Sequence, residues 1–143
     1  GDTMSKSNST ETDVLNLIFK ATAYPWNANT DLYVALHTAD PGEGGSQTTS
    51  EVSTIAYVNY ARVAVPRSGL GWTVSGDTSS NAALIQFAQA GVGSAATISH
   101  VSIGTAASGA GQILYSGALN DNLAVANLIQ PQFSIGALQI TED

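Results

Sequence analysis

Histidine is the side chain most readily used for metal binding or proton transfer, and this chain has two, His37 and His100. Each lies in a stretch typical of a β-strand, so the two rings could meet across neighbouring strands. A metal site needs three or four ligands, and the only carboxylate close to either histidine in the sequence is Asp40. The sequence therefore predicts ordinary hydrogen bonds for both rings and no metal ligands.

Acidic residues in a glycine-rich segment raise the question of calcium. Asp40 and Glu43 lie in the polar loop Ala39–Ser53 and could bind the ion together with backbone carbonyls. Calcium takes six or more oxygen ligands, and the spacing lacks the alternation of an EF-hand loop. Asp40 followed by Pro41 and Gly42 is equally typical of a tight turn. We expect a turn here, and a surface loop that contacts a partner, with calcium left as the alternative.

The sequence contains no recognisable nucleophile motif and no phosphate-binding motif. No serine lies in a G-x-S-x-G elbow, and most acids fall in the N-terminal tail, the helix start or loops. The glycines of segment 104–111 are followed by neither a lysine nor a helix, so they predict a turn instead of a phosphate cradle. We expect no catalytic and no cofactor-binding residues, and no enzymatic activity. Tyr33, Trp72 and Tyr115 could form a sugar-stacking platform, although aromatic residues more often fill cores.

Charge and composition exclude several classes of partner. The net charge is −7, and charged residues make up 10% of the chain, against about 25% in an ordinary soluble domain. Binding to nucleic acid depends on neutralising phosphates, and this balance argues against it as well as against anionic membrane surfaces. The chain has no cysteine, which excludes disulfides and thiolate sites. The basic residues are Lys6, Lys20, Arg62 and Arg67.

The N-terminal region is predicted to contain a short arm and one helix. Gly1–Thr3, before Met4, resembles an expression-vector remnant, and residues 1–10 should form a flexible polar arm. A helix is expected over residues 11–23, with Thr10 as its cap and apolar residues at helical spacing. Pro25 should end it. A helix this short is unstable alone, so it should pack on its own sheet or on a neighbouring subunit.

The rest of the chain, residues 31–141, is predicted to be β-structure within a single domain spanning 11–143. Short runs of strand-forming residues alternate with Gly, Pro, Asn and Asp at intervals of about ten residues. Leu32–Thr38 is apolar on both faces and should be a central strand. Asn120, Asp121 and Asn122 predict a turn. We expect an all-β fold: an antiparallel β-sandwich or jelly-roll-like barrel of about eight or nine short strands with one N-terminal helix. The other expected strands are Tyr57–Val65, Trp72–Val74, Asn81–Phe87, Thr97–Thr105, Gln112–Leu119, Leu123–Val125, Gln132–Ile135 and Ala137–Thr141.

Four stretches also carry a family resemblance: LYVALHTADPGEGG, YARVAVPRS, GWTVSG and GTAASGAGQILYSGAL. They resemble a family of small virion proteins of tailed bacteriophages that are often labelled tail-fibre proteins, over nearly the whole chain after Met4. The resemblance implies a virion protein, and the absence of cysteine fits assembly in the reducing cytoplasm of the bacterial host.

The role within the virion is open between two alternatives. We expect a capsid decoration (cement) protein that binds the major capsid protein on the head exterior, because the chain has no heptad or collagen-like stem. The alternative is a tail-fibre or tail-associated adaptor or receptor-binding module, with other virion proteins as partners. Open sheet edges and the apolar helix predict a homo-oligomer, with a trimer favoured over a dimer.

Overall fold

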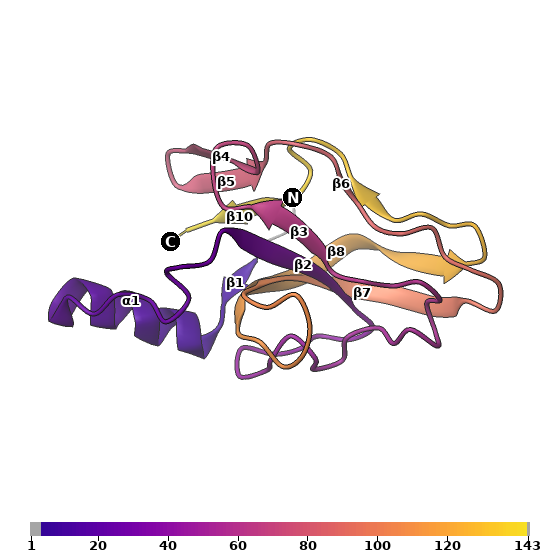
Figure 1. Cartoon of the computed structure of the whole chain (residues 1–143), viewed down its shortest axis with the longest axis horizontal. Coiled ribbons are helices and arrows are strands. Elements are labelled where there is room, and N and C mark those ends of the chain that lie inside the picture. The colour runs from indigo at the N-terminus through magenta and orange to yellow at the C-terminus, as the bar shows by residue number, and fades with distance from the viewer. Residues whose placement is uncertain (1–3, 143) are drawn as a thin grey trace.

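Strand β2 (Asp31–His37) lies near the centre of the fold. The computed structural model describes residues 4–142 and places β2 between β3 (Val63–Pro66) and β7 (Ala95–Gly104) in an antiparallel sheet (Figure 1). Along β2, side chains alternate between the two faces of the sheet. Val34 and Leu36 belong to the hydrophobic core, whereas Ala35 and His37 are buried outside that cluster. The prediction of a central strand, made from two apolar faces, is therefore confirmed.

The described strands form three sheets. The largest has the order β1-β8-β7-β2-β3, the second has the order β10-β5-β4, and β6 pairs with β9. All of the pairings are antiparallel. The remaining elements are β1 (Ser5–Lys6), α1 (Asn8–Lys20), β4 (Trp72–Ser75), β5 (Thr78–Asn81), β6 (Ile85–Gln86), β8 (Ile113–Ala126), β9 (Gln132–Phe133) and β10 (Gln139–Thr141).

The core lies between the large sheet and the layer made by the two smaller sheets (Figure 1). Ile85, Phe87 and Leu138 from the smaller layer are almost completely buried and belong to the same cluster as Val34 and Val101 of the large sheet. Burying apolar side chains between two sheets in this way is the main stabilising contribution of a sandwich. The prediction of an antiparallel sandwich with one N-terminal helix is confirmed. In residues 4–142 the sheets stay open, so the barrel alternative is wrong.

The N-terminal region is ordered earlier than expected. Met4 is buried and β1 pairs with β8, so the prediction of a flexible arm is wrong for residues 4–10, while Gly1–Thr3 lie outside the described residues. The Ser7 side chain accepts a hydrogen bond from the Thr10 amide at 3.1 Å, which makes Ser7 the cap and starts α1 at Asn8. The helix ends at Lys20 because Ala21 adopts a left-handed conformation, before Pro25 can act.

Two predicted strands are shorter than their patterns suggested. Of Tyr57–Val65 only the end belongs to β3, because the amide of Tyr60 bonds to the carbonyl of Tyr57 in a turn. That turn still buries both tyrosine rings in the core, which explains the apolar pattern. Asn81–Phe87 is split into β5 and β6, because the Asn81 amide nitrogen donates to the carbonyls of Ala83 and Ser134 and holds the chain in a bend.

Strand β8 runs through the turn predicted at Asn120–Asn122. Ile98 pairs with Leu123 and His100 pairs with Ala118, so residues 119–122 of β8 lie opposite Ser99 alone. The turn-forming residues therefore produce a bulge instead of a chain reversal. The bulge also shifts the alternation in β7, because Ile98 lies in the same core as Val101, whereas an unbroken period of two places them on opposite faces.

Candidate functional site

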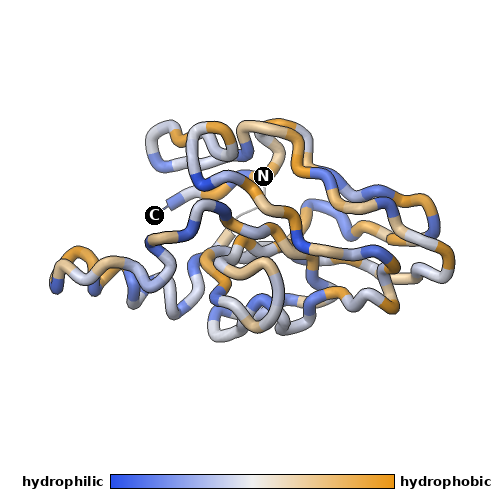
Figure 2. Tube along the Cα trace, viewed as in Figure 1, coloured by the Kyte–Doolittle hydropathy of each residue, from blue (hydrophilic) through white to orange (hydrophobic). Residues whose placement is uncertain are grey.

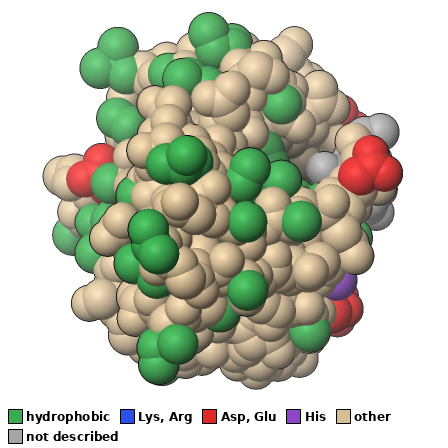
Figure 3. Space-filling view, turned by 90° about the vertical axis from the view of Figure 1, so that its right-hand side faces the viewer, with side chains coloured by type: hydrophobic (Ala, Val, Ile, Leu, Met, Phe, Trp, Pro, Cys, Tyr) green, Lys and Arg blue, Asp and Glu red, His purple; other side chains and the backbone are tan. Residues whose placement is uncertain are grey.

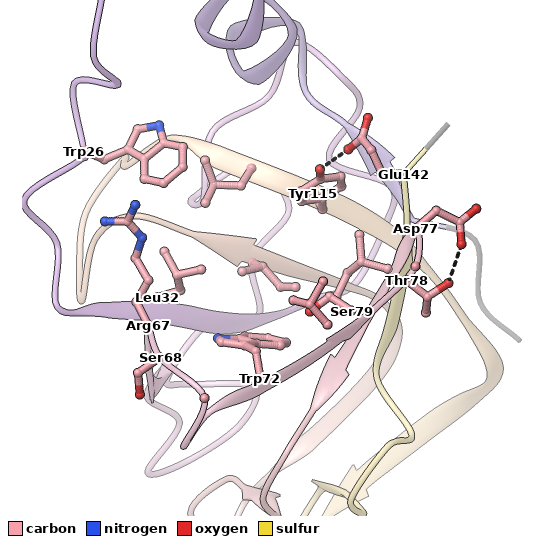
Figure 4. A pocket seen from close by; sticks show the side chains of 16 residues that line it. Trp26, Leu32, Arg67, Ser68, Trp72, Asp77, Thr78, Ser79, Tyr115 and Glu142 are labelled. Atoms are coloured by element: carbon pink, nitrogen blue, oxygen red, sulfur yellow. Dashed lines mark hydrogen bonds between the residues drawn. The ribbon is translucent and has the colours of Figure 1, made fainter. Parts of the chain in front are cut away.

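An apolar pocket of about 760 Å³ lies between the large sheet and the β10-β5-β4 sheet (Figure 4). Its residues come from distant parts of the sequence: Trp26 follows α1, Arg67 follows β3, Trp72 begins β4, Tyr115 lies in β8 and Ile140 lies in β10. Pockets of this size, mostly apolar with a few polar groups, are the usual form of a binding site. We call it the aromatic pocket.

One wall of the aromatic pocket is a stack of flat groups. The rings of Tyr24 and Trp26 lie parallel with centroids 4.5 Å apart, and the Arg67 guanidinium lies 5.0 Å from the Trp26 ring centroid. Arg67 also donates to the carbonyl of Asn27 at 2.7 Å. The Trp26 indole donates to Asp13 of α1 at 3.1 Å. The wall is therefore held from both sides, and it is joined directly to the helix.

The opposite wall is polar at its rim. The Tyr115 hydroxyl donates to a Glu142 carboxylate oxygen, and Lys6 donates to the other oxygen (the Tyr115–Glu142 bond is dashed in Figure 4). Burial raises the pKa of Tyr115, and the bond to Glu142 raises it further. Partial burial acts to raise the pKa of Glu142, but the bonds from Lys6 and Tyr115 outweigh it and lower that pKa.

Trp72 gives the aromatic pocket its one unusual polar atom. The Trp72 Nε1 nitrogen is buried and has no hydrogen-bond partner among the described residues. A buried donor without an acceptor costs free energy on the order of 1–3 kcal/mol. Natural proteins keep few such groups, and each one calls for an explanation. An acceptor supplied by a bound molecule would remove the cost.

The other face of the large sheet carries a buried polar network around the loop from Thr38 to Arg62. His37 is fully buried, with Nδ1 2.9 Å from the Thr49 carbonyl and Nε2 2.7 Å from the Ser102 hydroxyl. A carbonyl only accepts, so Nδ1 carries the proton and Nε2 accepts from Ser102. Burial lowers the pKa of His37, against an opposing contribution from the bond to Thr49.

An ion pair closes the same network. Arg62 donates from Nε and from one terminal nitrogen to the two oxygens of Glu51, at 2.8 and 2.9 Å, and both side chains are largely buried. The Tyr60 hydroxyl donates to Glu51 at 2.7 Å, and Arg62 also donates to the carbonyls of Ala106 and Gly109. Hydrogen bonding to Glu51 raises the pKa of Arg62. This is bidentate, charge-assisted pairing between two largely buried side chains.

Gln47 connects the loop to the glycine-rich segment after β7. It is fully buried, and its side-chain amide exchanges hydrogen bonds with the backbone of Ala106, at 3.1 and 3.0 Å. A Cβ atom at Gly104 would lie 2.3 Å from the Gln47 side chain, and one at Gly111 would lie 2.1 Å from it. These glycines therefore give space to Gln47. The sequence indicated a turn here, and nothing in the pattern pointed to the glutamine.

The two histidines and the acidic residues of the loop lie in different parts of the structure. His37 and His100 do pair across β2 and β7, but the described residues contain no group of three or more His, Cys, Asp or Glu that could hold a metal ion. Asp40 accepts from the Gly42 amide at 2.8 Å, as expected of a turn, and Glu43 is exposed. The pairing of Ser102 with His37 has the geometry of a nucleophile and base. Both side chains have no exposed surface, so no substrate reaches them.

Of the three aromatic residues predicted to form a platform, the structure brings two together. Trp72 and Tyr115 line the aromatic pocket, and Tyr33 does not. Trp26 and Arg67 also line the pocket, and no motif in the sequence pointed to them. The nearest indication in the sequence was the pair Tyr24 and Trp26 on either side of Pro25, and this pattern is equally typical of the end of a helix.

A protein-family model described as podophage GP4 fiber I protein gp80 matches residues 5–141. The chain belongs to this family. No curated protein matches the chain. Membership in a fibre family makes the protein a phage virion component, which confirms the virion prediction. Of the residues that line the aromatic pocket, all except Glu142 lie inside the matched range.

The remaining surface of this gp80-family chain has little charge. At the end opposite α1, hydrophobic side chains are scattered among polar atoms, and no lysine or arginine is visible on that face (Figure 3). Singly scattered apolar residues are normal on a protein surface. Among the described residues, no helix has the length and apolar character needed to cross a membrane.

Proposed function

We propose that the protein is a non-enzymatic structural component of a phage fibre, which acts as an adaptor by contacting other virion proteins. The observation that carries this proposal is the match to a fibre I protein over residues 5–141. The aromatic pocket supports a binding role, since its walls are apolar and aromatic and no histidine or lysine lines it. Assembly takes place in the cytoplasm of the bacterial host, where the other virion proteins are made.

Capsid decoration is the second candidate. It is favoured by the compact sandwich of residues 31–141, which contains no elongated stem of the kind that extends a fibre. In that role the protein binds the major capsid protein and strengthens the head. The two candidates use the same folded domain and differ in its place on the particle.

Comparing virions with particles that lack this gene separates the two candidates. A fibre adaptor predicts heads of unchanged stability, together with loss of fibres in electron micrographs and loss of adsorption to the host. A cement predicts intact fibres and heads that break at lower temperature or after chelator treatment. Antibody-gold labelling of intact virions independently locates the protein on the particle. Label on the head shell would overturn the fibre proposal.

The non-enzymatic part of the proposal needs its own test. We expect purified protein to show no turnover above buffer on glycan, ester, peptide and nucleotide substrates. Turnover that disappears in His37→Ala or His100→Ala would contradict it, because these are the only histidines of the chain. A folding check by circular dichroism accompanies each variant, since His37 is fully buried.

A further inference from the structure

The outer part of α1 exposes an apolar surface that its own chain does not cover. Leu15, Ile18 and Phe19 are 57%, 65% and 78% exposed, and the only buried residue of the helix is Thr10 near its start. Figure 1 shows α1 extending beyond the sheets, and Figure 2 shows hydrophobic residues on this outer part. A helix of this length is marginal in water unless its apolar face packs on something. Of the two predicted packing partners, its own sheet or a neighbouring subunit, its own sheet does not cover this part of the helix.

The first half of α1 is fixed to the body, so the helix cannot swing freely. Asp13 accepts hydrogen bonds from Trp26 at 3.1 Å and from Gln112 at 2.9 Å. The Thr10 hydroxyl accepts from Gln112 at 3.2 Å. Phe19 follows these anchors near the end of α1 and is exposed. An occupant for this apolar surface must therefore come from another molecule.

The aromatic pocket has the complementary properties. It is an apolar hollow at the base of the same helix, and it contains the buried Trp72 Nε1 donor without a partner. The last turn of any helix leaves carbonyl oxygens without intrahelical partners. The end of α1 therefore offers what the pocket lacks, namely large apolar side chains together with hydrogen-bond acceptors.

Charge also matches between the two surfaces. Lys20 lies in the last turn of α1 and forms no ion pair with a described residue. Asp77 lines the pocket and is exposed, with a hydrogen bond to the Thr78 hydroxyl and no basic partner in residues 4–142 (Figure 4). A rim contact of this kind contributes little affinity, but it favours one orientation of the docked helix.

We propose that the aromatic pocket is the docking site for helix α1 of a second copy of this chain. Ile18 and Phe19 enter between Trp26 and Trp72. The Trp72 Nε1 atom has almost no accessible surface in the single chain, so the Trp72 ring turns as the helix docks, and a carbonyl of the last helical turn then accepts the indole hydrogen. Each copy then donates one helix and receives one, so either a pair that exchanges helices or a ring of three fills every pocket. The proposal concerns self-association and holds for either position on the virion.

The test uses two single-surface variants of the full chain. Phe19→Glu places a charge on the exposed helix, and Val74→Glu places one in the pocket at a residue that is 74% exposed on an edge strand. Neither side chain is needed for the core, so both variants should fold. Analytical ultracentrifugation over a concentration series up to the millimolar range should show wild type associating, with each variant reduced to the 14.6 kDa monomer. Matched controls are Ile55→Glu and Val92→Glu, at 85% and 83% exposure outside both surfaces, which should associate like wild type.

Mixing the two variants identifies the partner surfaces. The Phe19→Glu chain keeps an intact pocket and the Val74→Glu chain keeps an intact helix, so an equimolar mixture should regain a heterodimer through one native contact. Trp72→Phe keeps most of the ring and removes the indole donor, and we expect it to weaken wild-type association roughly five- to tenfold. A wild-type protein that is monomeric at every concentration would overturn the proposal. A mixture that stays monomeric would also overturn it. So would a Val74→Glu chain that associates like wild type, because helix-to-helix pairing would then explain the oligomer.

Discussion

The two faces of the large sheet handle their buried polar groups in opposite ways. On the face covered by the loop from Thr38 to Arg62, the polar groups of Glu51, Arg62 and Gln47 are bonded within the chain. On the face that forms the aromatic pocket, the Trp72 indole is buried without a partner. A satisfied network specifies one conformation of a single chain. An unsatisfied donor in an apolar hollow is instead expected where a second molecule binds.

The largest effect is expected from breaking the ion pair. Arg62→Ala leaves the buried Glu51 carboxylate without its bidentate partner and removes one donor from each of the Ala106 and Gly109 carbonyls. Removing one partner of a buried pair typically costs about 3–5 kcal/mol of unfolding free energy. Chemical denaturation of Arg62→Ala against wild type measures it. The control is Arg67→Ala on the pocket side, where we expect a loss below about 1.5 kcal/mol. Equal losses would remove the contrast between the faces.

The next largest effect on stability is expected where the Gln47 side chain packs against Gly104. Gly104→Ala brings a Cβ to 2.3 Å from the buried Gln47 side chain, so the loop must shift. Overpacking of this kind typically costs about 1–3 kcal/mol. Gly69→Ala is the matched control, because nothing lies within 4 Å of its Cβ position, and it should change stability by no more than about 0.5 kcal/mol. A Gly104→Ala protein as stable as its control would show that the loop is loosely packed.

Lowering the pH should decrease the free energy of unfolding through protonation of His37. Burial holds its pKa below the ordinary 6.5, so the unfolded chain binds a proton at this residue more readily than the folded one. The His37 contribution is therefore fully present above pH 6.5 and decreases as the pH falls below that value, by at most about 1.4 kcal/mol per pH unit for one proton. Thermal unfolding across this range measures the slope. A slope that persists in His37→Gln would assign the effect to another group.

The smallest effect is expected on the rim of the aromatic pocket. Tyr115→Phe removes one hydrogen bond to Glu142, whose side chain is 47% exposed and keeps its contact with Lys6. Water replaces the lost donor, so the unfolding free energy should decrease by less than about 1 kcal/mol. Denaturation of this variant beside Arg62→Ala measures the contrast directly. A loss of several kcal/mol would mean that the pocket wall is as essential to the fold as the polar network.

Local patterns in the sequence predicted the sheets and the helix well, because each depends on neighbouring residues. The two apolar faces of Leu32–Thr38 placed that strand at the centre correctly, and the helix differed only in its ends. The errors arose where a side chain forms contacts with residues far away in the sequence. The Asn81 side chain donates a hydrogen bond to the Ser134 carbonyl and so holds the chain in a bend after β5. The segment at Tyr57, where a strand was expected, is a turn that buries the tyrosine ring. Such contacts leave no periodic signal.

The aromatic pocket could not be predicted from the sequence for the same reason. Its walls come from the segment after α1, from β4 and from β8, and only the fold brings them together. The sequence did select Trp72 and Tyr115 as aromatic residues able to stack. It could not show that Tyr33 faces elsewhere, or that Arg67 covers Trp26.

The placement of the tryptophans has a practical consequence. The chain contains two, Trp26 and Trp72, and both line the aromatic pocket. All of the intrinsic indole fluorescence of the protein therefore originates at one surface hollow, and none comes from elsewhere in the fold. Its emission wavelength and its quenching by iodide report whether that hollow is wet or filled. The fluorescence of the two native tryptophans therefore reports whether the aromatic pocket is occupied, without an added dye or label.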